Sequence, residues 1–313
     1  MTEKRILAAS AACLALSQPL AAQDLPQVEA LDPSSRTYPN LSPDGRYLLY
    51  SEGEGFALDI YRRDLETGAV LRLTASPHED SAASWSPDGQ WIAFQRETAD
   101  GNRDIWLIRA DGSEPRNFSA TPGIGEQHPR FTPDGTAILH DGNRHDDGVE
   151  GGLENYEIYR VPLAGGAPER LTGNPHWDLY PAPAPDGRAM AWVRALPVTD
   201  KDRPDFDVFM TDFDSGETRN LSDSPGYDTT PDWSPTGEWI VFASDRGAER
   251  YGRTDLYLIR PDGTDLRRVT DNGGTSMAFT RPRFAPDGRS LLASRSVAGV
   301  TDIVRIELGE LLD

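Results

Sequence analysis

The chain has 313 residues, with 51 Asp and Glu against 31 Lys and Arg, which gives a formal net charge of −20. Such a charge repels phosphates, so no nucleic acid is expected as a partner. A single cysteine excludes a disulfide scaffold. The 29 Gly and 25 Pro disfavour long helices, because each such residue inside a helix costs about 1 to 3 kcal/mol.

Residues 1–22 are typical of a signal peptide. Two basic residues precede an apolar run at 6–16 that is too short to span a bilayer, and small residues allow cleavage after Ala22. Alternatives are a buried N-terminal helix and a lipoprotein acylated at Cys13. No later segment is apolar enough to be transmembrane. We therefore expect a periplasmic or secreted protein that loses its cysteine with the signal.

A tetrapeptide close to Ser-Pro-Asp-Gly recurs at intervals of 44 to 52 residues. The six copies begin at Ser42, Ser86, Thr132, Ala184, Ser234 and Ala285. The motif is a turn, since Pro presets φ, Asp hydrogen-bonds locally and Gly adopts positive φ. A repeat of this length across most of the chain indicates a solenoid or propeller.

Each repeat indicates four short strands. One strand leads into the turn, and an apolar, β-rich strand such as 91–94 follows it. The third begins with an acid and two apolar residues, as at Asp59, Asp104 and Asp255, and a second Gly-containing turn leads to the fourth. Because these third-strand acids recur in every repeat, we expect them to be structural.

Six four-stranded repeats predict an all-β fold, a six-bladed β-propeller, over residues 23–313. An open solenoid or two sandwiches are the alternatives. The sixth repeat ends after its third strand, and segment 27–31 has the spacing of the missing fourth, so we expect it to close the ring. The predicted blades are about 36–74, 80–119, 126–172, 178–222, 228–270 and 279–313 plus strand 27–31.

The fifth repeat carries a resemblance to the TolB-like propeller family, also described as WD40-like or PD40 repeats. The matching motifs are Pro-Asp-Trp-Ser-Pro at 231–235, Phe-Ala-Ser-Asp-Arg at 242–246, Asp-Leu-Tyr at 255–257 and Arg-Arg-Val-Thr at 267–270. TolB is a periplasmic component of the Tol–Pal envelope system, and its propeller docks a lipoprotein. The resemblance implies an exported propeller that binds a protein or peptide partner.

Acids recur six residues before the repeat turn in four successive blades, each just before an innermost strand. We expect them to ring one mouth of the central channel and to attract a basic segment of a protein or peptide. The side chains of one histidine and one tyrosine lie beside these acids. The predicted partner-binding residues are therefore Asp80, Glu126, His128, Asp178, Tyr180 and Asp228. The four acids are also weak candidates for a Ca²⁺ site, and solvated acids without a site are the third alternative.

The loops between strands two and three are longest in blades 3 to 5, at 141–155, 196–205 and 245–254. Variable loops on a rigid scaffold usually carry function, so we expect these to form a wall beside the mouth.

The motifs that indicate an enzyme are missing from this sequence, so we predict no catalytic residue. Gly-x-Ser-x-Gly, His-Glu-x-x-His and Gly-Lys-Ser do not occur. Because some related propellers are enzymes, a metal-assisted carbohydrate lyase or hydrolase using His and acids of the same face stays open. A structural module of an envelope complex is the third alternative. We expect a monomer.

Overall fold

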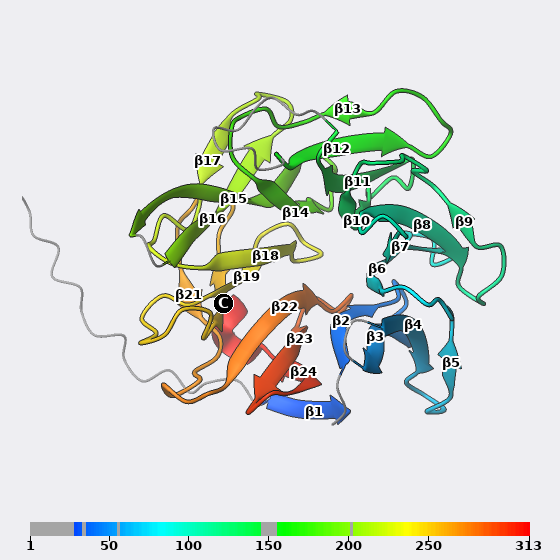
Figure 1. Ribbon diagram of the computed structural model, residues 1–313. Helices are drawn as coiled ribbons and strands as arrows, with labels where there is room; N and C mark the ends of the chain where they lie inside the picture. Colours follow the sequence, from blue (N-terminus) through cyan, green and yellow to red (C-terminus); the bar gives the residue numbers. More distant parts are fainter. Residues whose placement is uncertain (1–27, 33–35, 55–56, 145–154, 201–202) are drawn as a thin grey trace, which may run out of the picture.

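The computed structural model describes residues 28–32, 36–54, 57–144, 155–200 and 203–313. Its strands form six antiparallel sheets of four strands each, arranged in a ring (Figure 1). This confirms the six-bladed propeller predicted from the repeats. The predicted signal peptide lies outside the described residues.

The strands follow one another in chain order, and each blade begins with its innermost strand. Blades 1 and 2 contain β2 (Arg36–Leu41), β3 (Tyr47–Glu54), β4 (Ala57–Asp64), β5 (Val70–Arg72), β6 (Asp80–Trp85), β7 (Trp91–Glu97), β8 (Arg103–Arg109) and β9 (Arg116–Asn117). Blades 3 and 4 contain β10 (Glu126–Phe131), β11 (Ala137–Gly142), β12 (Glu157–Pro162), β13 (Glu169–Arg170), β14 (Asp178–Pro183), β15 (Ala189–Asp200), β16 (Arg203–Asp212) and β17 (Thr218–Asn220). Blades 5 and 6 contain β18 (Asp228–Trp233), β19 (Ile240–Ser244), β20 (Asp255–Ile259), β21 (Arg267–Arg268), β22 (Ala278–Phe284), β23 (Ser290–Val297), β24 (Val300–Glu307) and β1 (Val28–Asp32), with a 3₁₀ helix η1 (Gly309–Leu312) at the end.

The ring closes through β1, which pairs antiparallel with β24. Val28 lies opposite Ile306, and Ala30 lies opposite Val304. The segment before the first repeat thus supplies the fourth strand of the last blade, as expected, and covers an edge that would otherwise have unpaired backbone groups.

The core consists of apolar clusters between neighbouring blades rather than one central core. Leu49 of blade 1 shares a buried cluster with Phe94 of blade 2. Across the closure, Tyr50 of blade 1 packs in a cluster with Leu292 and Ile303 of blade 6. Each large apolar side chain buried in this way contributes roughly 1.5 to 3 kcal/mol, so the blades hold one another in place.

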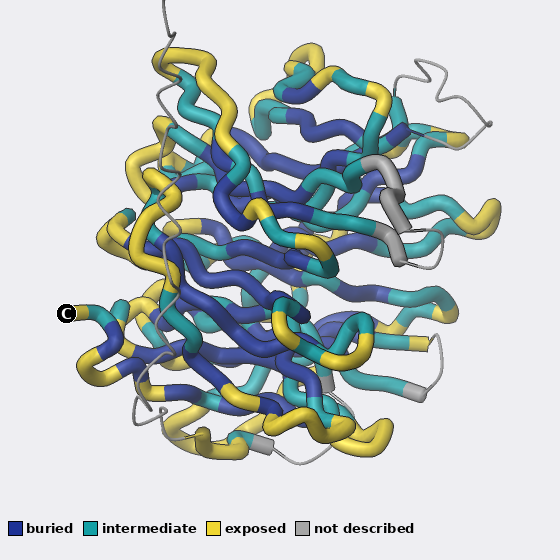
Figure 2. Tube along the Cα trace, turned by 90° about the vertical axis from the view of Figure 1, so that its left-hand side faces the viewer, coloured by how far each residue is buried: buried dark blue, intermediate teal, exposed yellow. Residues whose placement is uncertain are grey.

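The repeat turn explains why its sequence recurs. In the first copy, Ser42 Oγ donates a hydrogen bond to the Asp44 carboxylate and accepts one of 2.8 Å from the Tyr47 backbone N–H. Gly45 has φ of 74°, a conformation that favours glycine. Together these turns define the turn face of the ring. The strand 2–3 loops and blade connections define the opposite loop face, and exposed segments gather at the strand ends (Figure 2).

The third-strand acids hold the fourth strands in place. Asp59 Oδ1 accepts hydrogen bonds from Thr74 Oγ1 at 3.2 Å and from the Ser76 backbone N–H at 3.1 Å. Asp255 Oδ1 likewise accepts one of 2.9 Å from Thr270 Oγ1. These contacts fit the structural role that their recurrence indicated.

Candidate functional site

The four predicted mouth acids are buried, and each is paired with an arginine of its own blade. Their side chains are at most 1% exposed. The pairs are Asp80–Arg96, Glu126–Arg144, Asp178–Arg194 and Asp228–Arg246. The acid begins the innermost strand, and the arginine lies on the second strand (Arg96 and Arg194) or two residues beyond its end (Arg144 and Arg246). The antiparallel register places Arg96 opposite Asp80 and Arg194 opposite Asp178.

Two of these pairs are bidentate. Arg96 Nε and Nη2 donate to the two oxygens of Asp80 at 2.6 and 2.7 Å. Arg194 donates in the same way to Asp178, at 2.9 and 3.0 Å. Bidentate guanidinium–carboxylate pairs are among the strongest hydrogen-bonded contacts in proteins. Each pair therefore fastens the start of an innermost strand to its neighbour.

Each paired arginine also lies over an aromatic ring of its blade. The Arg96 guanidinium carbon is 4.4 Å from the centre of Trp106, and that of Arg194 is 4.6 Å from the centre of Trp192. Such cation–π contacts strengthen when they are desolvated. We call each acid–arginine–aromatic unit a mouth clamp. Blades 1 and 6 depart from the pattern, because Arg36 and Phe279 stand at the acid position there.

The arginine at the corresponding place of blade 6 still finds a carboxylate. Arg295 pairs with Asp302 of β24, the third-strand acid of that blade. In blade 6 the guanidinium is thus neutralised although no acid stands at the start of the innermost strand.

Burial affects the titration of the clamp acids. It raises the pKa of Asp178 to about 6, although the hydrogen bonds from Arg194 act in the opposite direction. Burial also raises the pKa of Asp80 against the effect of Arg96. Desolvation thus outweighs the pairing in both clamps.

From the sequence these acids were expected to ring the channel mouth and attract a basic segment, whereas in the structure each lies buried against an arginine. The arginines neutralise them inside their blades, so they do not form a solvated acidic ring. A Ca²⁺ ion would have to displace those arginines. Within the described ranges, no three His, Cys, Asp or Glu side chains are placed to hold a metal ion. Partner binding through these acids and Ca²⁺ at the mouth stay predictions.

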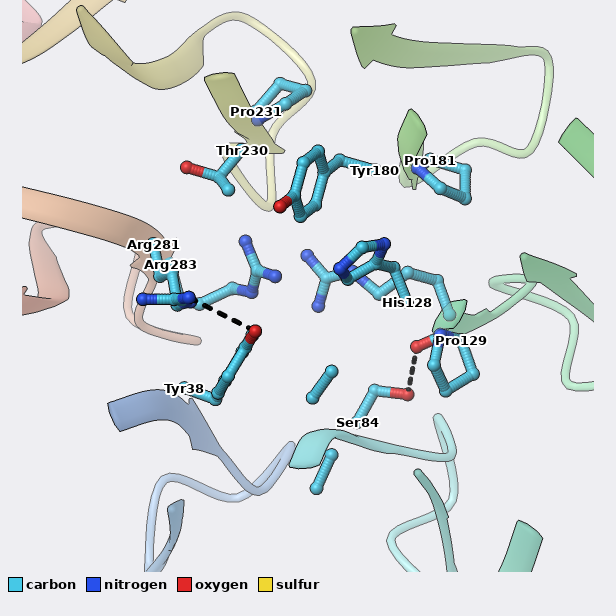
Figure 3. Close-up of a pocket in the computed structure, with 13 residues that line it drawn as sticks. Tyr38, Ser84, His128, Pro129, Tyr180, Pro181, Thr230, Pro231, Arg281 and Arg283 are labelled. Atoms are coloured by element: carbon cyan, nitrogen blue, oxygen red, sulfur yellow. Dashed lines mark hydrogen bonds between the residues drawn. The ribbon is translucent and has the colours of Figure 1, made fainter. Parts of the chain in front are cut away.

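Two residues beyond the acid position, each blade turns one residue into the channel. All six have φ between 51° and 58°, in the left-handed region, at a register shift of the innermost strand. We call them the channel ring: Tyr38, Ala82, His128, Tyr180, Thr230 and Arg281. All six line one cavity, so the ring surrounds the axis of the propeller (Figure 3).

The channel ring unites two predicted residues with two that the sequence analysis missed. The rings of His128 and Tyr180 are in contact, with centroids 3.9 Å apart. On the other side, Arg281 lies 4.0 Å from the ring centre of Tyr38 and donates a hydrogen bond of 3.1 Å to its Oη. A signal for the missed pair existed, since Tyr38 and Arg281 each precede the recurring proline of the innermost strand.

A buried carboxylate fixes the histidine side of the ring. Asp141 Oδ1 lies 2.9 Å from His128 Nδ1 and accepts a hydrogen bond of 3.1 Å from the Tyr180 backbone N–H. Burial raises the pKa of the Tyr180 phenol, which therefore stays protonated. His128 and Tyr180 thus face the channel as a fixed polar and aromatic pair.

An ion pair connects blades that are not neighbours. Arg130 of β10 reaches Asp232 of β18 at 2.5 Å, so it joins blade 3 to blade 5. The other oxygen of Asp232 accepts a hydrogen bond of 2.9 Å from the Phe284 backbone N–H in blade 6.

The channel is narrow at the channel ring, where the cavity volume is about 20 Å³. A second cavity of about 240 Å³ lies beside Trp85 and Phe131, toward the turn face.

The expected wall is partly visible. β15 and β16 form a long hairpin, and Phe206 packs edge-on against Tyr227 with ring centroids 5.3 Å apart. Tyr227 packs in turn against Tyr251 of blade 5, at 5.4 Å. Blades 4 and 5 therefore share an aromatic cluster. The loop of blade 3 falls largely at 145–154, outside the described residues.

Comparisons with known proteins agree with this architecture. The Tol-Pal system protein TolB of Francisella tularensis is 24% identical over 250 residues, 79% of this chain and 54% of that protein. The structure of TolB from Acinetobacter baumannii superposes with a TM-score of 0.66 and 26% identity, over 80% of this chain and 57% of that chain. An oligogalacturonate lyase in complex with manganese gives a TM-score of 0.62 at 16% identity, over 92% and 95% of the two chains, which shows the fold alone.

The chain spans between 29% and 64% of the length of the first curated relatives that it matches. In the part that the structure describes, no helix has the length and apolar character needed to cross a membrane. The family described as TolB beta propeller domain matches residues 28–200 and 193–310. These two matches cover nearly all of the described chain, which therefore belongs to the TolB β-propeller family.

Proposed function

We propose that this chain is an exported, periplasmic propeller that binds a protein or peptide partner on its loop face. The observation that carries the proposal is the joint presence of the channel ring and the aromatic cluster. Tyr and Arg are among the residues that dominate binding energies at protein interfaces. Both occur in the ring, and Tyr227 and Tyr251 occur in the wall beside it. The likeness to TolB proteins supports this reading.

A basic segment of the partner, as expected from the sequence, would be attracted by long-range electrostatics. The net charge of −20 steers cationic partners toward the protein. The charges of the clamp acids are neutralised by Arg96, Arg144, Arg194 and Arg246. The short-range contacts with a partner must therefore come from other groups. We propose that Tyr180 and His128 at the ring and Tyr251 at the wall provide the apolar and polar contacts.

A photo-crosslinking residue placed on each face tests this proposal in cells. One derivative carries the crosslinker at Tyr251 on the loop face, and its matched control carries it at Glu238, an exposed residue beside the repeat turn of blade 5. We expect a specific crosslinked protein with the first derivative and none with the second. Equal crosslinking from both faces, or none from either, rejects the loop face as the binding surface.

A metal-assisted carbohydrate lyase or hydrolase is the second candidate. It is favoured by the likeness to oligogalacturonate lyase, which covers nearly the whole of both chains. Elemental analysis of the purified protein decides the matter, because tight stoichiometric metal supports this reading and its absence opposes it. A structural module of an envelope complex predicts crosslinks at both faces, and size-exclusion chromatography with light scattering tests the expected monomer.

A further inference from the structure

Two arginines of β22 enter the central channel without a carboxylate partner. Arg281 and Arg283 both line the cavity at the channel ring (Figure 3). Among the described residues, the hydrogen bonds of their guanidinium groups go to neutral oxygens, Tyr38 Oη at 3.1 Å and the Pro282 carbonyl at 2.9 Å. Arg281 Nε is buried and has no hydrogen-bond partner. In a chain with 20 more acids than bases, such a pair needs an explanation.

The nearby carboxylates cannot neutralise this pair, because other groups already engage them. Asp232 is shared between Arg130 and the backbone N–H of Phe284. Asp141 is held by His128. The channel therefore contains more positive than negative charge at this level. Burial, followed by repulsion from Arg130, lowers the pKa of Arg283 to about 9.

We infer that the channel ring is an anion site that takes one carboxylate-sized group between Arg281 and Arg283. Two guanidinium groups match the planar geometry of a carboxylate. Tyr38 accepts its hydrogen bond from Arg281, so its own O–H is free to donate toward the cavity. The volume of about 20 Å³ admits one small group and no bulky one. An anion also removes the cost of burying uncompensated charge.

This inference concerns a small free anion and does not depend on a protein partner. The probe is sodium acetate, and sodium pivalate is its matched control. Pivalate has the same charge and the same carboxylate but a tert-butyl group too bulky for the cavity. At constant ionic strength, we expect acetate and not pivalate to raise the melting temperature of the full chain, with a dependence that saturates. Isothermal titration calorimetry should show one acetate site.

The substitution Arg281→Gln should weaken acetate binding at least about tenfold, since it removes a charged hydrogen-bond donor. Arg283→Gln should do the same, and it keeps the test valid if the first variant does not fold. The control is Arg289→Gln, which changes an exposed arginine in the repeat turn of the same blade. It should bind acetate like the wild type.

Two results would overturn the inference. One is an equal effect of acetate and pivalate on the wild type, which indicates a general salt effect. The other is unchanged acetate binding in folded Arg281→Gln and Arg283→Gln, which places the site elsewhere. Crystals soaked in bromide supply an independent readout, because an anomalous peak between Arg281 and Arg283 is expected and a peak only at surface arginines contradicts the assignment.

Discussion

The mouth clamps and the channel ring lie two residues apart on the same strands, yet they treat charge in opposite ways. At the clamp position Asp178 is buried against Arg194. Two positions along, Tyr180 faces the axis, and in blade 6 Arg281 does so without a carboxylate. The clamps repeat with little change, as structural parts do. The ring residues differ from blade to blade, and this variation on a fixed backbone is where a propeller acquires specificity.

The largest effect is expected from breaking a clamp on one side. Asp80→Ala leaves the Arg96 guanidinium without its carboxylate beside a buried strand, and this should lower the free energy of unfolding by about 3 to 5 kcal/mol. Urea unfolding measures the loss. The double variant Asp80→Leu with Arg96→Met is the control, because it removes both charges and should recover most of the stability. A double variant as unstable as the single one would show that packing, not the unpaired charge, causes the effect.

The second effect concerns pH. The pKa of Asp178 is about 6 in the folded chain and close to 3.8 when unfolded, so the folded state binds more protons between these values. The contribution of Asp178 to stability is therefore greatest at low pH and falls by about 2 kcal/mol as the pH rises from 4 to 6, out of about 3 kcal/mol over the whole titration.

The variant Asp178→Asn isolates this contribution from the other acids, many of which have the opposite slope. Urea unfolding at pH 4, 5 and 6 should give a wild-type curve that falls more steeply with pH than the curve of the variant. Parallel curves would mean that Asp178 titrates near its ordinary value and that the clamp compensates its burial.

A substitution in the channel ring should change the free energy of unfolding in the opposite direction from a substitution in a clamp. Arg281→Met removes an unpaired charge and keeps an apolar chain against Tyr38. In a buffer without small anions, we expect the free energy of unfolding to rise by about 1 kcal/mol. Thermal unfolding in pivalate measures it, and Arg194→Met, which leaves Asp178 unpaired, is the comparison that should lose stability. Loss of stability in both variants would remove the distinction between clamp and ring.

The sequence predicted the fold because its signals are local. The Pro-Asp-Gly turn satisfies its own hydrogen bonds within six residues, from Ser42 to Tyr47. It can therefore be recognised from the sequence of each repeat alone. The closing strand β1 could be predicted from spacing alone. Such features depend on turn chemistry and not on distant contacts.

The site was harder to predict because its character depends on pairing. Asp80 and Asp178 look like surface acids until the register brings an arginine 16 residues later against each of them. The channel ring depends on residues with a left-handed backbone conformation, such as Tyr180, and their residue types do not predict that conformation. Arg130 and Asp232 meet across 102 residues, a distance that only the closed ring bridges.

The smallest effect is expected from an ion pair of the same chemistry on the surface. Arg305 and Glu307 lie 2.8 Å apart, but their side chains are 33% and 59% exposed. Glu307→Ala should change the free energy of unfolding by no more than about 0.5 kcal/mol, and added salt should reduce even this. Urea unfolding at two salt concentrations checks both points. A loss near that of Asp80→Ala would mean that burial is not what distinguishes a clamp from any other arginine–carboxylate pair.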